Sequence, residues 1–240
     1  MPSPPYLREF VLTTTPARRE RLGNIDLYLP DQAPPRPAIL FVHGGPISAD
    51  LRPTPRDWPV YLGYGNAAAQ RGLIGVTVDH RFYGLADLPV SAGDVAEAVE
   101  AVRKDPRVDG ERIALWFFSG GGVLLADWLR EPPSWLRCAA ASYPVLGPRP
   151  DRELPPRFHP AEVLDQAGDL PIVLTRVGRE APSIAQTVEA FVAAARSHGA
   201  LLEVIDVPDG RHAFDVLDDT DESRRAIEVA LESVAGHLGG

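Results

Sequence analysis

The stretch RIALWFFSGGG, residues 112–122, decides the fold and puts a serine at its most informative point. Its first seven residues are mostly apolar, which is typical of a strand buried on both faces. Ser119 and three glycines follow at once, and the next residues, VLLADWLR, continue as a helix. We therefore predict a sharp strand-to-helix turn that exposes Ser119 beside free backbone N–H groups. The alternative is that Ser119 only caps the helix.

Similar apolar runs occur on both sides of this strand and alternate with helical segments. The runs are residues 37–42, 73–79, 137–143, 171–177 and 201–207, and the helical segments are 60–71, 91–104, 120–130, 183–198 and 221–238. This alternation predicts a mostly parallel, doubly wound α/β sheet with helices on both faces. Two earlier runs, 6–12 and 23–29, alternate apolar and polar residues and predict an antiparallel hairpin at the sheet edge. Without an internal repeat or linker, we expect one domain over residues 1–240.

The composition excludes several classes of function. The 240 residues are 45% hydrophobic and carry a net charge of -9, which argues against a nucleic-acid partner because phosphate binding needs clustered positive charge. No apolar run is long enough for a membrane span and no secretion signal is visible, so we expect a soluble, cytoplasmic protein. The single cysteine, Cys138, lies in an apolar run and is expected in the core. No dinucleotide or phosphate-binding glycine motif occurs, so neither a cofactor nor a metal is expected.

A second glycine turn, FVHGGP, follows the first strand of the predicted parallel sheet. Such a turn can supply a backbone N–H to an oxyanion hole, together with the N–H of Gly120. Pro46 has no N–H, so the donor must be Gly44 or Gly45. Alternatively, the motif is only a tight turn.

His212 lies in DGRHAFD, between the last predicted strand and the last helix. A histidine there can reach the same sheet edge as Ser119 and accept its proton. It could equally be a surface loop residue. The other histidines fit a base less well: His43 belongs to the glycine turn, His80 comes too early in the chain, His159 lies in a Pro-rich loop, and His198 and His237 end helices.

An acid that orients His212 should follow a strand and lie between Ser119 and His212 in the chain. Glu180 in TRVGREAPS meets both conditions. Asp209 and Asp215 are too near His212 in sequence, and Asp169 precedes its strand and so lies at the opposite end of the sheet. The alternative is that Glu180 is a surface carboxylate paired with Arg176 or Arg179.

These motifs together resemble the α/β-hydrolase superfamily, and within it the dienelactone hydrolase-like group of serine esterases, over roughly residues 20–238. The resemblance implies Ser119 as nucleophile, His212 as base and Glu180 as acid, with the N–H groups of Gly120 and of Gly44 or Gly45 as the oxyanion hole. The implied activity is hydrolysis of small-molecule carboxylic esters through an acyl-enzyme, without a cofactor. Two positions depart from the family pattern: Phe117 replaces the first glycine of G-x-S-x-G, and glutamate stands where aspartate is commoner.

Phe117 leaves a non-catalytic binding module open as an alternative, and a peptidase or amidase on the same fold is another. Only 27 residues separate the strands around 137–143 and 171–177, which is too few for a large lid. Loop aromatics that could wall a small pocket are Trp58, Tyr61, Tyr64, Tyr83 and Phe158. Arginines that could bind a substrate carboxylate are Arg52, Arg56, Arg81, Arg149, Arg152, Arg157 and Arg179.

Overall fold

The apolar runs form the inner strands of one twisted sheet in the computed structural model, which describes residues 4–150 and 152–239. Among the described residues the sheet has eight strands in the order β1-β2-β4-β3-β5-β6-β7-β8. Strands β3 to β8 run parallel, while β1 and β2 are antiparallel to their neighbours. The strands are β1 Arg18–Leu22, β2 Ile25–Leu29, β3 Arg36–Val42, β4 Ile74–Val78, β5 Val108–Phe118, β6 Leu136–Ser142, β7 Ile172–Arg179 and β8 Leu202–Arg211. The predicted mostly parallel sheet with an antiparallel edge is confirmed.

The first strand of the edge hairpin was predicted in the wrong place. Residues 6–12 are not a strand, and β1 is the charged segment Arg18–Leu22. Its register explains the choice, because Arg21 lies opposite Asp26 of β2 and donates to its carboxylate at 2.9 Å. Phe10, within the mispredicted segment, instead packs its ring 4.8 Å from the ring of Tyr64. The alternation of apolar and polar residues in 6–12 therefore belongs to a segment that packs on the helix Pro59–Gln70 and not to a strand.

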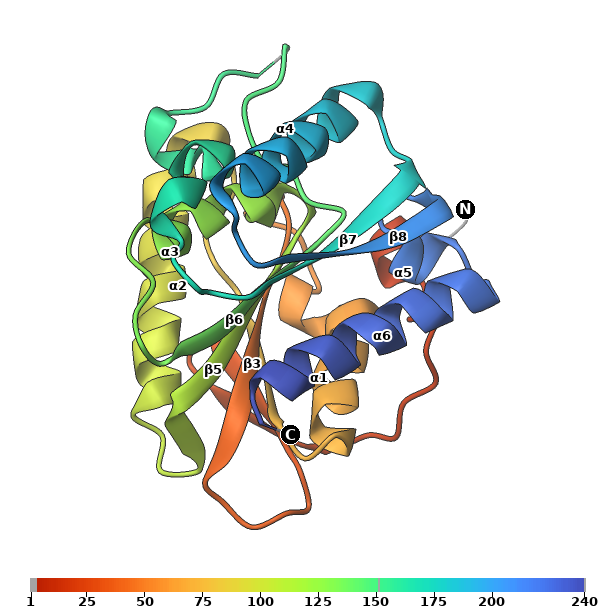
Figure 1. Cartoon of the computed structure of the whole chain (residues 1–240). Helices are drawn as coiled ribbons and strands as arrows, with labels where there is room; N and C mark the ends of the chain where they lie inside the picture. The colour runs from red at the N-terminus through yellow and green to blue at the C-terminus, as the bar shows by residue number, and fades with distance from the viewer. Residues whose placement is uncertain (1–3, 151, 240) are drawn as a thin grey trace.

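Helices cover both faces of the sheet, as Figure 1 shows. One face carries α2, Leu88–Arg103, α3, Leu125–Arg130, and α4, Pro182–His198, and the other carries α1, Pro59–Gln70, and α6, Asp221–His237. A short α5, Phe214–Leu217, follows β8. The predicted helix 120–130 begins as a 3₁₀ helix, Ser119–Leu124, and becomes α-helical only in α3, since three successive glycines favour an α-helix poorly. Further 3₁₀ turns are Pro5–Leu7, Pro55–Asp57, Leu85–Asp87, Pro156–Phe158 and Pro160–Gln166.

Strand β5 separates two apolar cores. Leu115 and Phe117 belong to the core beneath α2, α3 and α4, while Trp116 and Phe118 belong to the core beneath α1 and α6. This alternation follows from the two-residue period of a strand, and all four side chains are essentially inaccessible to solvent. Cys138 on the neighbouring β6 is also fully buried, as its apolar context predicted.

The carboxyl ends of the parallel strands meet at one edge of the sheet, where open α/β sheets place their ligands. The segment between β6 and β7 contributes only two 3₁₀ turns, Pro156–Phe158 and Pro160–Gln166, among the residues that the structure describes. No large lid covers this edge in the described part of the chain.

Candidate active site

Ser119 lies at the tip of the turn between β5 and the helix that follows, with φ of 50°. A positive φ is strained for a residue with a Cβ, and such strain gathers at functional sites. The carbonyl of Ser119 accepts the N–H of Val145 at 2.9 Å, which fixes the turn against the end of β6. The turn therefore presents the serine hydroxyl outward at the carboxyl edge of the sheet.

The three glycines after Ser119 are required by close backbone contacts. A Cβ on Gly120 would lie 2.1 Å from the carbonyl oxygen of Gly45, and one on Gly121 would lie 2.6 Å from that of His43. A Cβ on Gly122 would lie 2.6 Å from the Cβ of Pro144. The glycines thus let the start of the helix touch the HGG turn and the segment after β6.

Phe117 occupies the apolar core and leaves the turn undisturbed. Its side chain is fully buried, and its partners across the sheet are Val42 on one side and the small Ala141 on the other. The close approach that a glycine two residues before the serine would allow is provided here by the glycines after it. Phe117 is therefore a packing residue in this chain.

We expect Phe117→Gly to destabilise the protein by about 3–5 kcal/mol, since it removes a buried ring and leaves a cavity. The free energy of unfolding measured by urea denaturation tests this. Activity per folded molecule should not increase. An inactive wild type that gains activity through this substitution would instead support the binding-module interpretation.

The pairing of β7 with β8 brings Glu180 beside His212. Arg179 pairs with Arg211, so the residue after each strand end lies next to the other. A register shift precedes this pair, because two steps on β7 between Val177 and Arg179 correspond to four on β8. The two extra residues of β8 form a bulge beside Gly178, whose backbone packs closely against Pro208. The bulge determines which residue of β8 ends opposite Arg179, and therefore where His212 lies relative to Glu180.

Ser119, His212 and Glu180 form a continuous chain of hydrogen bonds. The Ser119 Oγ lies 2.6 Å from His212 Nε2, and His212 Nδ1 lies 2.6 Å from Glu180 Oε2. A carboxylate only accepts, so Nδ1 carries the proton and Nε2 is left to accept from the serine hydroxyl. The other oxygen of Glu180 accepts the N–H of Ala181 at 2.7 Å, and the Glu180 side chain is only 4% exposed.

The rival carboxylates lie elsewhere. Asp209 is exposed and pairs with Arg179 at 3.2 Å. Asp215 is buried and accepts from the hydroxyls of Tyr143 at 2.7 Å and Tyr64 at 3.2 Å, and burial raises the pKa of its carboxyl to about 6. Glu180 does not pair with Arg176, which contacts Asp206 and Glu189. Of the acids considered, only Glu180 contacts His212.

The two glycine turns place free N–H groups beside Ser119. The N–H of Gly44 donates to the hydroxyl of Tyr61 at 3.3 Å, whereas the N–H of Gly45 has no acceptor among the described residues. Gly120 lies in the first turn of its helix, where N–H groups lack intrahelical partners. The N–H groups of Gly45 and Gly120 are therefore free to donate to a ligand, whereas the N–H of Gly44 already donates to Tyr61.

Sequence reasoning missed the role of His80, which supports the HGG turn from beneath. Its ring stacks on that of His43 at 3.8 Å, its Nε2 donates to the His43 carbonyl at 3.0 Å, and its Nδ1 accepts from Ser91 of α2 at 2.6 Å. His43 in turn donates from Nδ1 to the carbonyl of Gly44 at 2.6 Å. All of these bonds are made by neutral rings. Each of the two histidines comes just after an apolar strand, and this arrangement gave no signal that their rings would pair.

Burial lowers the pKa of His43 and, together with the neighbouring His43, lowers that of His80 well below its usual value. In the unfolded chain both rings bind a proton below about pH 6.5, so stability should fall as pH decreases through that value. Asp215 acts in the opposite direction, because its raised pKa lets the folded state bind a proton first. We expect a net loss of up to about 2 kcal/mol between about pH 7.5 and pH 5.5.

Urea denaturation at the two pH values measures this loss. His80→Gln should reduce the pH dependence, because one titrating ring is removed, and Asp215→Asn should increase it, because the opposing group is removed. Stability that is constant or rises toward pH 5.5 would contradict the neutral histidine pair.

Two cavities meet at Ser119. One, of about 350 Å³, is lined by Tyr6, Trp58, Tyr61, Tyr143 and His212 among others, and we call it the aromatic cavity. The other, of about 110 Å³, is the small cavity, and its walls include Phe82, Leu85, Val123, Leu154 and Ile184, with Arg149 and Arg152. The three described non-glycine residues with positive φ, Ser119, Tyr143 and Ala213, all line the aromatic cavity. Backbone strain is thus concentrated around it.

Only some of the loop residues expected near the site lie there. Of the aromatics, Trp58 and Tyr61 line the aromatic cavity, whereas Tyr64 and Phe158 are in the core and Tyr83 is 44% exposed. Of the arginines, Arg149 and Arg152 line the small cavity. The rest bond elsewhere: Arg52 to carbonyls, Arg56 to Asp79, Arg81 to Asp94, Arg157 to Asp127 and Arg179 to Asp209.

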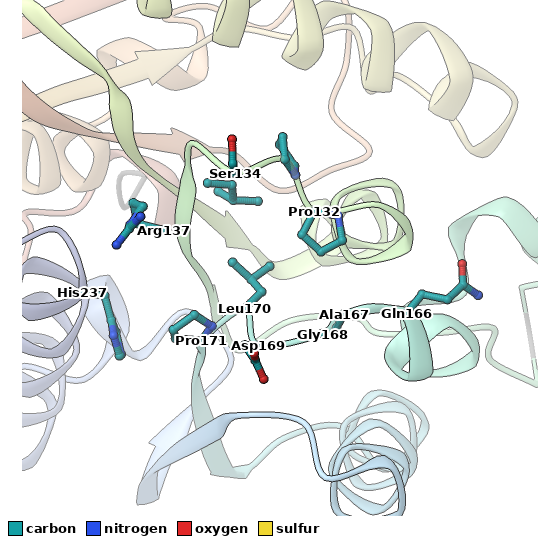
Figure 2. A pocket seen from close by; sticks show the side chains of 12 residues that line it. Pro132, Ser134, Arg137, Gln166, Ala167, Gly168, Asp169, Leu170, Pro171 and His237 are labelled. Atoms are coloured by element: carbon teal, nitrogen blue, oxygen red, sulfur yellow. The ribbon is translucent and has the colours of Figure 1, made fainter.

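A larger hollow, of about 480 Å³, lies at the opposite edge of the sheet. Figure 2 shows it between the segments that precede β6 and β7, with Arg137 and His237 on one side and Gln166 on the far side. Asp169 lies here, away from His212, as its place before a strand predicted. The lining residues Gln166, Asp169 and His237 are all exposed, so the hollow is an open surface feature.

Within residues 4–150 and 152–239, no helix combines the length and apolar character needed to cross a bilayer. The same residues contain no group of three or more His, Cys, Asp or Glu side chains that could hold a metal ion.

Comparison with known proteins addresses the fold. A family model described as BD-FAE matches residues 25–127, which include the HGG turn and Ser119. The thermophilic esterase Est2 of the planctomycete Thermogutta terrifontis is 19% identical, with a TM-score of 0.69 over 92% of both chains. EstE1, a thermostable carboxylesterase cloned from a metagenomic library, is 18% identical, with a TM-score of 0.74 over 95% of this chain and 92% of its own. The chain has the α/β-hydrolase fold. No curated protein sequence matches it.

Ser119 stands at the strand-to-helix turn after β5, and Glu180 and His212 come later in the chain, after β7 and β8. Because the carboxyl ends of parallel strands share one edge of the sheet, Glu180 and Ser119 contact His212 although they lie 32 and 93 positions before it in the chain.

Proposed function

We propose that the protein is a serine hydrolase of the dienelactone hydrolase-like kind, formed by a single domain over residues 1–240, that cleaves small carboxylic esters. The observation that carries this proposal is the unbroken hydrogen-bond chain from Ser119 through His212 to Glu180. This chain joins the outward-facing hydroxyl of Ser119, whose backbone is strained, to His212, whose tautomer is fixed by the nearly buried carboxylate of Glu180. That combination activates a hydroxyl as a nucleophile.

The proposed reaction has two halves. Ser119 Oγ attacks the ester carbonyl while His212 Nε2 takes its proton, and the oxygen that becomes negative accepts from the N–H groups of Gly45 and Gly120. The carbon–oxygen bond to the alcohol then breaks, and His212 returns the proton to the leaving oxygen. Water then attacks the acyl-enzyme while His212 takes its proton, and as the bond between the acyl carbon and Ser119 Oγ breaks, His212 returns that proton to Oγ, which releases the acid and restores Ser119. One oxyanion-hole donor contributes about 10²–10³ in rate in comparable enzymes.

The structurally similar proteins support the reaction class. Thermogutta terrifontis esterase 2, phosphoramylated by tabun, superposes with a TM-score of 0.71 at 20% identity over 95% of both chains. The same esterase is also phosphorylated by paraoxon. We extend from these esterases to this chain the capacity to react with an activated ester or phosphoester. A cytoplasmic setting is part of the proposal and rests on the sequence alone.

We expect acetyl and butyryl esters to be hydrolysed with higher kcat/KM than esters of ten or more carbons. No lid in the described residues supplies apolar surface for a long chain, and the two cavities at Ser119 have volumes of only about 110 Å³ and 350 Å³. A series of p-nitrophenyl esters of increasing chain length measures this selectivity, and the matching p-nitroanilides test for an amidase. Preference for long acyl chains would contradict the size argument, and absence of turnover with every ester would contradict the hydrolase proposal.

A further inference from the structure

The two cavities at Ser119 differ in which catalytic group they contain. The aromatic cavity includes His212, whereas the small cavity includes Gly120 but not His212. Both include Ser119 and Gly45. A bound ester therefore has two directions in which its halves can extend, and the catalytic groups distinguish them.

The chemistry of the proposed reaction assigns one half to each direction. The tetrahedral carbon bears the serine oxygen, the oxyanion, the acyl substituent and the alcohol oxygen. His212 must protonate the alcohol oxygen as its bond to carbon breaks, so that oxygen lies within hydrogen-bond reach of Nε2. With the oxyanion directed at Gly45 and Gly120, the acyl substituent is left to the side away from His212.

Resting on the proposed function, we infer that the aromatic cavity binds the alcohol and the small cavity binds the acyl group, so that the substrates are short-chain acyl esters of aryl or arylalkyl alcohols. The volumes agree, at about 350 Å³ for the alcohol side and about 110 Å³ for the acyl side. The small cavity is closed by the buried side chains Phe82 and Val123 and by the partly buried Leu85.

The walls of the aromatic cavity suit a flat, apolar group. The ring of Tyr6 lies 4.8 Å from that of Trp58, and the Trp58 ring lies 6.1 Å from that of Tyr61. Trp58 is held by a hydrogen bond from its indole N–H to the carbonyl of Pro53 at 2.9 Å. An aromatic group bound against these rings could make offset or edge-to-face contacts with them.

Tyr6 makes the N-terminal segment part of this cavity. The residues that follow Tyr6 hold this segment in place. The N–H of Val11 donates to the carbonyl of Asp215 at 3.0 Å, and Phe10 packs on Tyr64. The segment that carries Tyr6 is thus held by Asp215, just after His212, and by Tyr64 of α1. Tyr6 is a specificity-determining residue for the alcohol, and it takes no part in bond making.

The test crosses one variant of each cavity with two pairs of esters. Benzyl acetate and ethyl acetate share the acyl group and release alcohols of similar basicity, so their ratio reports binding of the alcohol. Ethyl acetate and ethyl hexanoate share the alcohol and differ in the acyl chain. The variants are Tyr6→Ala and Leu154→Ala, with Tyr6→Phe to retain the ring and Tyr83→Ala as an exposed tyrosine outside both cavities.

We expect Tyr6→Ala to lower kcat/KM for benzyl acetate by about tenfold and to change ethyl acetate and ethyl hexanoate by less than about twofold. Leu154→Ala should raise the hexanoate-to-acetate ratio by about tenfold and leave the benzyl-to-ethyl ratio unchanged. Tyr6→Phe and Tyr83→Ala should resemble the wild type. Melting temperatures show whether each variant is folded.

Exchanged effects, in which Tyr6→Ala alters acyl-chain selectivity and Leu154→Ala alters alcohol selectivity, would overturn the assignment. So would a Tyr6→Ala variant that is folded and treats every ester as the wild type does. These results would leave the hydrolase proposal intact, because they require turnover. A wild type that hydrolyses none of these esters would refute the proposed function itself.

Discussion

Ser119→Ala is expected to reduce ester hydrolysis by about 10⁶ in kcat while leaving the protein folded. In the proposed reaction this hydroxyl forms the acyl-enzyme, and no other described side chain at the site hydrogen-bonds to His212 Nε2. The backbone turn and the apolar contacts do not depend on the hydroxyl. Hydrolysis of p-nitrophenyl acetate, with the melting temperature measured alongside, tests this. Ser134→Ala, in the hollow at the opposite edge of the sheet, is the matched control and should behave as the wild type.

Residual turnover of Ser119→Ala near the wild-type level would show that another nucleophile acts. The proposed triad would then be wrong, although the fold would stand. Loss of turnover accompanied by a large fall in melting temperature would be uninformative by itself, so the comparison is made per folded molecule.

Glu180→Gln is expected to lower kcat by up to about 10⁴ with little change in KM. The amide can present an N–H to His212 Nδ1, which favours the tautomer whose proton lies on Nε2, facing the serine. Glu180→Asp should retain partial activity, because the charge remains and only the reach shortens. The contact at issue is the 2.6 Å hydrogen bond between Nδ1 and Oε2.

Two neighbouring carboxylates provide the controls for Glu180. Asp209→Asn removes an exposed charge that pairs with Arg179, and Asp215→Asn keeps an acceptor for the hydroxyls of Tyr143 and Tyr64. Both should cost far less kcat than Glu180→Gln. If one of them abolished turnover and Glu180→Gln did not, the acid would be misassigned, while Ser119 and His212 could still stand.

Ser119, Glu180 and His212 could be brought together from sequence because Ser119 directly follows one predicted parallel strand, and Glu180 and His212 lie in the segments that follow two others. The carboxyl ends of parallel strands share one edge, so residues far apart in the chain meet without any knowledge of side-chain packing. Phe117 could not be interpreted in this way, since its effect depends on the small Ala141 beside it and on contacts of the glycines after Ser119.

Features that depend on contacts between distant segments were not predictable. We propose Gly45 and not Gly44 as an oxyanion-hole donor because the hydroxyl of Tyr61 accepts the N–H of Gly44. The HGG turn is supported by the ring of His80, which stacks on that of His43. The place of Tyr6 beside the site depends on where the N-terminal segment crosses the helices. The strand prediction for residues 6–12 was wrong because alternating apolar side chains can pack one side of a segment against a helix as well as against a sheet.

The most direct test of the central claim is covalent labelling of the wild-type protein with a fluorophosphonate, followed by mass spectrometry of its peptides. The account predicts one phosphonyl adduct per chain, carried by Ser119 and absent from Ser119→Ala, with loss of ester hydrolysis in proportion to labelling. An unlabelled wild type, or an adduct on a different residue with Ser119 unmodified, would contradict it.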